Sequence, residues 1–181
     1  MKTNFKISHY TRQGIFILLS ILTLQNAGAI NEANEYSIKA MFLINFIKYI
    51  DWPHETPKTV FNIGIVGDSE IYDELIKIPA LKTTDSRKII ITKISSSDLS
   101  EQDMIFISRS ENKRLDQVVK KFSRKGVLII SEDVRLQLNQ SCINLKKVNH
   151  LVCFEINLSN CKDNGLSISN KLLALSNNKN Q

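Results

Sequence analysis

Val60-Phe-Asn-Ile-Gly-Ile-Val66 is a short, almost continuously apolar run, followed by Gly67-Asp68-Ser69 and a helical pattern to about residue 78. Three further runs of this kind lie at 88–94, 104–107 and 126–131, and an amphipathic helix is expected at 111–123. Strands of a parallel sheet have such continuously apolar sequences because helices cover both faces of the sheet. The sequence therefore predicts an α/β fold: a single three-layer domain with a mostly parallel sheet and helices on both faces.

The last third of the chain has a different pattern, that of a C-terminal antiparallel hairpin. Residues 142–145 and 151–158 alternate between apolar and polar side chains. One face of the hairpin would carry Ile143, Leu145, Phe154 and Ile156. A short helical segment is expected within 159–175, and the tail from residue 177 is expected to fray.

Residues 35–51 have helical periodicity, with two apolar stripes that cover most of the helix surface. The first stripe is Ile38, Met41, Phe42, Phe46, Tyr49 and Ile50, and the second is Ala40, Leu43, Ile44 and Ile47. Such a helix must be buried on more than one face, either between the sheet and a partner helix or at a subunit interface. Lys39 and Lys48 are expected to reach solvent past these faces. Trp52-Pro53 ends the helix, with Trp52 either a core anchor or part of a binding surface.

The first 29 residues have the features of a secretory signal peptide. They hold three basic residues and no acidic one, an apolar run at 15–24, and the small triplet Ala27-Gly28-Ala29. An apolar helix of this length covers about 15 Å, half of the ~30 Å hydrocarbon core of a membrane. We therefore expect cleavage after Ala29 and an exported domain at 30–181, ordered from about 34 to 176. The net charge falls from +6 to +3 without this segment, which argues against a nucleic-acid partner.

The remaining residues show no pattern that points to catalysis. His54 and His150 each stand alone, so no metal-ligand spacing is present. Cys153 follows His150 by three residues, which places the two side chains on opposite faces of a strand. We predict that the protein is not an enzyme and uses no metal and no cofactor.

The three cysteines all lie in the C-terminal third, where an oxidising compartment allows either one disulfide or three buried thiols. Cys142 and Cys153 are the first candidates for a disulfide, since a turn centred near residues 147–148 would place them opposite each other. A turn at Asn149-His150 would offset them.

Two loops are expected at the carboxyl edge of the sheet, where doubly wound folds bind ligands. Asp68 and Ser69 follow the first strand, and they either line a ligand site or cap the next helix. Arg109 follows the third strand and either faces an anion or is an ordinary solvated arginine, while Ser110 is expected to cap the helix after it.

One long motif resembles the opening signature of the YfiR family of small periplasmic proteins. It is Tyr36-x-x-Lys39-Ala40-x-Phe42-Leu43-x-Asn45-Phe46-x-Lys48-Tyr49-x-x-Trp52-Pro53. Later segments are similar to the family in the same order: 61–68, 105–111, 143–145, 154–158 and 165–175. The hairpin turn, often Asp-Gly in the family, is Asn149-His150 here, and this turn requires positive φ angles that glycine adopts more easily.

The resemblance implies a periplasmic regulator without enzymatic activity, often a homodimer. Such proteins bind the periplasmic part of an inner-membrane diguanylate cyclase and hold it inactive, and so control cyclic-di-GMP and biofilm formation. An OmpA-like outer-membrane lipoprotein can sequester the inhibitor, and other relatives serve sensor kinases. Within the motif, Lys48, Trp52 and Pro53 are candidates for partner binding. The alternative is a small-molecule sensor module that uses Asp68, Ser69 and Arg109.

Overall fold

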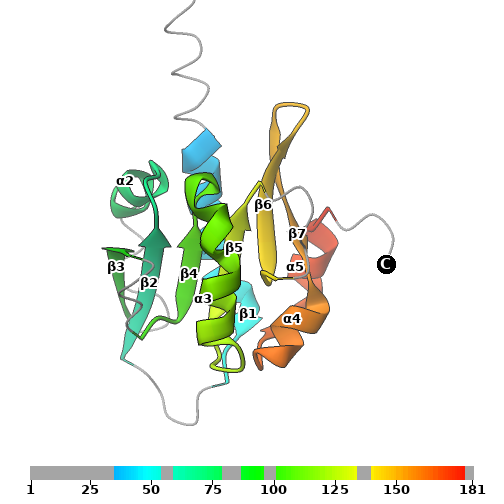
Figure 1. Cartoon of the computed structure of the whole chain (residues 1–181). Helices are drawn as coiled ribbons and strands as arrows, with labels where there is room; N and C mark the ends of the chain where they lie inside the picture. Colours follow the sequence, from blue (N-terminus) through cyan, green and yellow to red (C-terminus); the bar gives the residue numbers. More distant parts are fainter. Residues whose placement is uncertain (1–34, 54–58, 79–86, 96–100, 134–139, 178–181) are drawn as a thin grey trace, which may run out of the picture. The chain divides into compact units, whose positions relative to one another are not determined.

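The computed structural model describes residues 35–53, 59–78, 87–95, 101–133 and 140–177. The central element is a six-stranded sheet with the strand order β3-β2-β4-β5-β6-β7 (Figure 1). The strands are β2 (Val60–Val66), β3 (Lys88–Ile94), β4 (Met104–Ile107), β5 (Leu128–Glu132), β6 (Ile143–Val148) and β7 (Leu151–Ile156). All neighbouring strands are parallel except β6 and β7, which form the hairpin. The predicted α/β fold with a mostly parallel sheet is confirmed.

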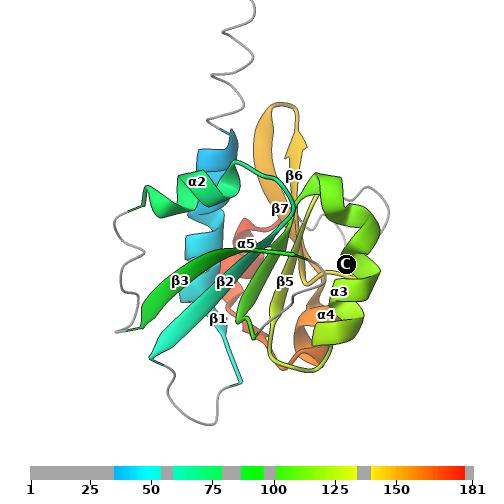
Figure 2. The same ribbon diagram turned by 60° about the vertical axis from the view of Figure 1, so that its left-hand side comes forward.

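Helices lie on both faces of the sheet (Figure 2). One face packs against a helix at residues 35–49, called the N-terminal helix below, and against α2 (Ile71–Ile76) and α5 (Asn170–Leu175). The opposite face packs against α3 (Leu115–Phe122). Strand β4 shows why its sequence is continuously apolar. Met104 and Phe106 point into the first core, Ile105 and Ile107 point into the second, and all four side chains are fully buried.

The sheet and these helices belong to one compact unit, which spans residues 36–181. The predicted signal peptide at 1–29 and the expected start of the exported domain at residue 30 lie outside the described residues. Among the residues that are described, no helix has the length and apolar character needed to cross a membrane.

The N-terminal helix is shorter than its sequence pattern predicts. It ends at Tyr49, and the next two residues form a short strand, β1 (Ile50–Asp51), which pairs with β8 (Ser167–Ile168). The helix is most deeply buried along its second apolar stripe, whereas Met41 of the first stripe is 59% exposed. The helix is therefore buried against the sheet and has one exposed side.

Two other segments differ from the predicted elements. The expected helix at 111–123 begins earlier, with a 3-10 turn, η2 (Arg109–Arg114), that leads directly into α3. The expected helical segment within 159–175 is two helices, α4 (Leu158–Asp163) and α5, separated by β8. Gly165 ends the first of them with a φ of +75°, a conformation that glycine adopts without steric cost.

The hairpin has the predicted buried face and the turn at Asn149-His150. Ile143 pairs with Ile156 and Leu145 with Phe154, and all four side chains are buried. The last pair before the turn is Val148 with Leu151, so the two turn residues take positive φ angles, 47° for Asn149 and 66° for His150. This register offsets Cys142 from Cys153, which pairs with Lys146.

The positive φ at His150 predicts a stabilising substitution. His150→Gly is expected to raise the free energy of unfolding by about 0.5–1 kcal/mol, because glycine adopts this φ without steric strain. Thermal unfolding measures the change. His150→Ala removes the same imidazole and keeps the strain, so it serves as the control and is expected to show no such gain. Equal midpoints for the two variants would contradict the prediction.

Candidate functional site

A buried ion pair attaches the N-terminal helix to the carboxyl edge of the sheet. The ammonium of Lys39 lies 2.6 Å from a carboxylate oxygen of Glu132, the last residue of β5, and each side chain is only 1% exposed. The other oxygen of Glu132 accepts a hydrogen bond from the backbone N–H of Arg109 at 2.9 Å. The side-chain amide of Asn112 donates to the backbone carbonyl of Glu132 at 2.8 Å.

The expectation that Lys39 reaches solvent is therefore wrong. Lys39 lies on the helix face that is directed toward the end of β5. There the carboxylate of Glu132, 93 residues later in the sequence, neutralises its charge. Burial of two charges is tolerated when they are paired and their other hydrogen-bonding positions are occupied. The Lys of the signature motif is thus a structural contact between helix and sheet.

Two further contacts hold the N-terminal helix, one toward each end. Near its start, the hydroxyl of Ser37 donates to the carboxylate of Glu74 in α2. Hydrogen bonds from Lys77 and Ser37 lower the pKa of Glu74. Near its end, the ammonium of Lys171 in α5 lies 4.9 Å from the centre of the Tyr49 ring. A hydrogen bond with Lys171 lowers the pKa of the Tyr49 phenol. The helix is thus attached to α2, β5 and α5.

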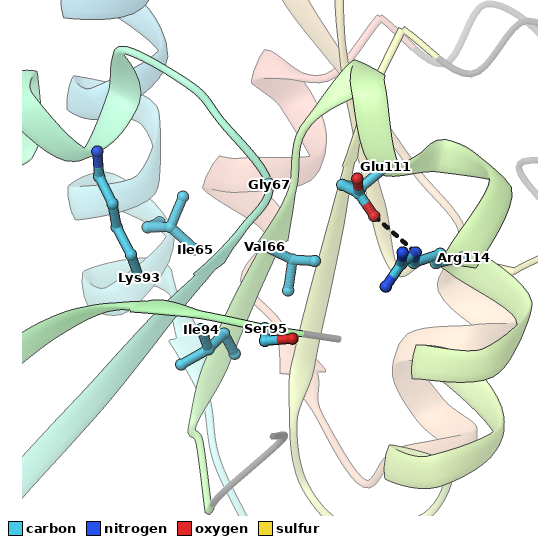
Figure 3. Close-up of a pocket in the computed structure, with 8 residues that line it drawn as sticks. All are labelled: Ile65, Val66, Gly67, Lys93, Ile94, Ser95, Glu111 and Arg114. Atoms are coloured by element: carbon cyan, nitrogen blue, oxygen red, sulfur yellow. Dashed lines mark ion pairs between the residues drawn. The ribbon is translucent and has the colours of Figure 1, made fainter. Parts of the chain in front are cut away.

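A cleft of about 320 Å³ opens at the carboxyl edge of the sheet (Figure 3). It lies at the point where β2 leads to β3 on one side and β4 leads to β5 on the other, the usual ligand position in doubly wound folds. Its lining residues come from the ends of β2 and β3 and from η2: Ile65, Val66, Gly67, Lys93, Ile94, Ser95, Glu111 and Arg114.

Gly67 lets the strand end and η2 come close together. Its φ is +89°, and a Cβ at this position would lie 2.2 Å from the Ser108 hydroxyl oxygen and 2.6 Å from Cγ of Glu111. Both distances are too short for real atoms, so only glycine is compatible with this backbone. The shape of this wall of the cleft therefore depends on residue 67.

The charged side chains around the cleft already have partners. Nε of Arg114 lies 2.9 Å from a carboxylate oxygen of Glu111, as Figure 3 shows. The ammonium of Lys93 lies 4.9 Å from the centre of the Tyr72 ring. The cleft is of the size that a small ligand needs, with one anionic and two cationic groups at its rim. In the described parts of the chain, no group of three or more His, Cys, Asp or Glu residues could hold a metal ion.

None of the three predicted edge residues belongs to the lining of the cleft. Asp68 is exposed, and Ser69 is buried with its hydroxyl accepting a hydrogen bond from the backbone N–H of Ile71 at 3.3 Å, as a helix cap does. Arg109 is 59% exposed and pairs with Asp133 at 3.1 Å. The hydroxyl of Ser110 contacts that of Ser108 at 2.9 Å, so the expectation that it caps a helix is wrong.

Sequence reasoning did not identify Lys93, Glu111 and Arg114 as lining residues. Glu111 and Arg114 were detectable in principle, because a spacing of three in a helical segment places opposite charges side by side. The sequence around Lys93 gave no indication of this position, because Lys93 reaches the cleft only through the pairing of β3 with β2.

The motif candidates Lys48, Trp52 and Pro53 lie at the opposite, amino end of the sheet. The indole N–H of Trp52 donates to the backbone carbonyl of Asp103 at 3.1 Å, and its ring meets that of Phe61 edge-on at 5.0 Å. Trp52 is therefore a core anchor, one of the two roles that its position allowed.

Pro53 fits between two glycines. Added Cβ atoms at Gly126 and Gly165 would each lie 3.0 Å from Cγ of Pro53, and both residues have positive φ angles, +71° and +75°, so glycine is favoured at both positions. Lys48, by contrast, is exposed on the N-terminal helix. The structure thus separates the three candidates from Asp68, Ser69 and Arg109, and these six residues do not form one site.

The exposed side of the N-terminal helix carries a stripe of residues at spacings of three and four. This outer stripe consists of Ile38, Met41, Asn45 and Lys48. Met41 is 59% exposed and Lys48 is exposed, whereas Ile38 and Asn45 are half-buried. The stripe lies opposite the face that packs on the sheet, so it is available to another molecule.

Removal of Lys39 tests the ion pair. Lys39→Met is expected to lower the free energy of unfolding by about 3–5 kcal/mol, because it leaves the Glu132 carboxylate buried without its cation. The double variant Lys39→Met/Glu132→Gln is expected to lose clearly less free energy of unfolding than the two single variants lose together, since no uncompensated charge remains. Urea denaturation of the two single variants and the double variant measures the coupling. A double variant whose loss equals the sum of the two single losses would contradict this account.

Comparison with protein families matches residues 36–177 to the family described as YfiR/HmsC-like. The match includes the whole of the described sheet and the N-terminal helix from Tyr36. No curated protein matches the chain.

Proposed function

Because the chain belongs to the YfiR/HmsC-like family of periplasmic regulators of cyclic-di-GMP signalling, we propose that it binds and represses an inner-membrane diguanylate cyclase. Proteins of this family interact with an inner-membrane partner and are regulatory rather than enzymatic. The family match over the entire described fold is the observation that carries the proposal. A signal peptide at 1–29 would bring the chain to the compartment where the sensor part of such a cyclase lies.

The outer stripe of the N-terminal helix is the surface that we assign to the partner. Met41 is a large apolar side chain at 59% exposure on a helix whose other face is deeply buried, and the half-buried Ile38 lies one turn away on the same side. Lys48 adds a positive charge one heptad further on the same side. An amphipathic helix of the partner with acidic residues at its border would match this stripe.

Two further interactions complete the proposal. An OmpA-like outer-membrane lipoprotein would relieve repression by sequestering the protein from the cyclase. A homodimer is also expected, as the resemblance implies.

The cleft supports a second candidate function, that of a small-molecule sensor serving a sensor kinase. Its position at the carboxyl edge and its volume of about 320 Å³ are those of a ligand site. The charges at its rim favour a small ligand that itself carries charged groups. Asp68 and Ser69 directly follow Gly67 of the lining, and with Arg109 they are the sequence-predicted candidates for this function.

Cellular cyclic-di-GMP tests the cyclase proposal. A strain without the gene is expected to contain several-fold more cyclic-di-GMP, and re-expression with residues 1–29 present is expected to reverse the rise. Met41→Glu is expected to be exported and folded, because the side chain is exposed, and to fail to repress. Leu175→Glu changes an apolar side chain of similar exposure, 62%, on α5 and is the matched control that should repress normally.

Other outcomes of this experiment separate the two functions. An unchanged cyclic-di-GMP level in the deletion strain, with expression and export of the wild-type protein verified, would overturn the cyclase proposal and favour the sensor kinase. Loss of repression by both glutamate variants would overturn the assignment of the outer stripe alone.

A further inference from the structure

Two cysteine thiols are buried side by side where α4 packs on the start of β6. Cys142 immediately precedes β6 and Cys161 lies in α4, and each is 1% exposed. The backbone carbonyl of Cys142 accepts a hydrogen bond from Asn157 N–H at 2.9 Å, and Cys161 N–H donates to the carbonyl of Asn157 at 3.0 Å. Asn157 therefore lies opposite Cys142, and Cys161 lies one helical turn beyond Asn157. The Cys161 sulfur is 3.7 Å from the carbonyl oxygen of Cys142.

The two thiols also influence each other's ionisation. A hydrogen bond from the Cys161 thiol lowers the pKa of Cys142, and the amide of Asn164, 3.8 Å from the Cys142 sulfur, acts in the same direction. The contact with Cys142, together with burial, raises the pKa of Cys161. In the packed structure Cys142 is thus the thiol of the pair with the lower pKa.

The third cysteine is too far away to take part. The residue opposite Cys142 is Asn157, four positions beyond Cys153, which corresponds to roughly 13 Å along the strand. A disulfide requires Cα atoms that are about 4.4–6.8 Å apart. Cys153 instead pairs with Lys146 across the hairpin, and its sulfur accepts a hydrogen bond from the side-chain amide of Asn177 at 3.8 Å.

We propose that Cys142 and Cys161 form a disulfide in the periplasm that attaches α4 covalently to β6, in place of the Cys142–Cys153 pairing that one turn placement allowed. This inference uses the periplasmic location of the proposed function but not its partner. In the structure both cysteines are free thiols.

The reaction is an exchange with a disulfide oxidant, such as a periplasmic protein disulfide or oxidised glutathione. The Cys142 thiolate attacks one sulfur of the oxidant, forms a mixed disulfide and releases one thiol. The Cys161 thiolate then attacks the Cys142 sulfur and releases the second thiol. The two protein thiols lose two protons and two electrons, and the oxidant gains both. Because both cysteines are buried once α4 has packed, the exchange takes place before packing, and the same balance holds if Cys161 makes the first attack.

The disulfide would reinforce contacts that α4 already makes. The amide of Asn160 donates to the Ser141 carbonyl at 3.0 Å, and the carbonyl oxygen of the Asn164 side chain accepts from Arg124 N–H at 3.0 Å. The closed loop would contain the whole β6–β7 hairpin. Its closure restricts the unfolded chain and holds the outermost strand of the sheet in place.

Disulfide mapping of the full chain, exported and purified from the periplasm without reductant, tests the proposal. Trypsin releases residues 136–146 with Cys142, but residues 148–162 hold both other cysteines. A second cleavage after Glu155 separates Cys153, in 148–155, from Cys161, in 156–162. We expect 136–146 linked to 156–162, and Cys153 modified by an alkylating reagent. Reduced protein refolded with oxidised glutathione should give the same linkage without any dependence on export or on a cyclase.

Stability provides an independent measurement. Reduction is expected to lower the Tm of the wild-type protein by roughly 6–12 °C, the effect of opening a loop of about 20 residues. Cys153→Ser is the matched control and should show the same shift, whereas Cys142→Ala/Cys161→Ala should show none. Three free thiols in both preparations, or a link between 136–146 and 148–155, would overturn the proposal. A mapped Cys142–Cys161 link in a strain with unchanged cyclic-di-GMP would contradict only the proposed function.

Discussion

The buried pair of Lys39 and Glu132 determines how the N-terminal helix lies on the sheet. Each of these two charges would be costly to bury without the other, so the helix can pack only where the lysine reaches the end of β5. With that position set, Phe42 and Phe46 meet the ring of Phe154 edge-on, at 5.1 Å and 5.2 Å between ring centres. The ion pair thus sets the position in which the N-terminal helix also contacts β7, the strand at the far edge of the sheet.

This placement gives the two sides of the N-terminal helix different roles. The inner side carries the second apolar stripe and closes the larger core. The outer side keeps Met41 and Lys48 at the surface, although the helix was expected to be buried on more than one face. The almost continuous apolar pattern of residues 35–51 therefore reflects burial of the second stripe and of Phe46 and Ile50 from the first, with Met41 left exposed on the outer side.

The two ends of the sheet also differ. At the amino end, Trp52 packs on Phe61 and Pro53 fits against two glycines, so the signature motif stabilises the fold at that end. At the carboxyl end, the strand ends separate and leave the cleft beside Gly67. The motif that identifies the family is thus mainly a structural one. A regulator that acts by binding needs this rigid frame beneath an accessible helix surface.

The sequence by itself determined the elements whose signals are local. The strands β2, β3, β4 and β5 were predicted to within two residues from their apolar runs, and the buried face of the hairpin was predicted as well. Tertiary structure alone decided the rest. The partner of Lys39 is 93 residues away, β1 and β8 are two residues each, and the cleft joins three separate elements. Cys142 lies beside Cys161 rather than Cys153 because the turn at Asn149-His150 sets the register and α4 folds back over β6. Such contacts depend on where elements meet in space, which neither periodicity nor spacing along the chain records.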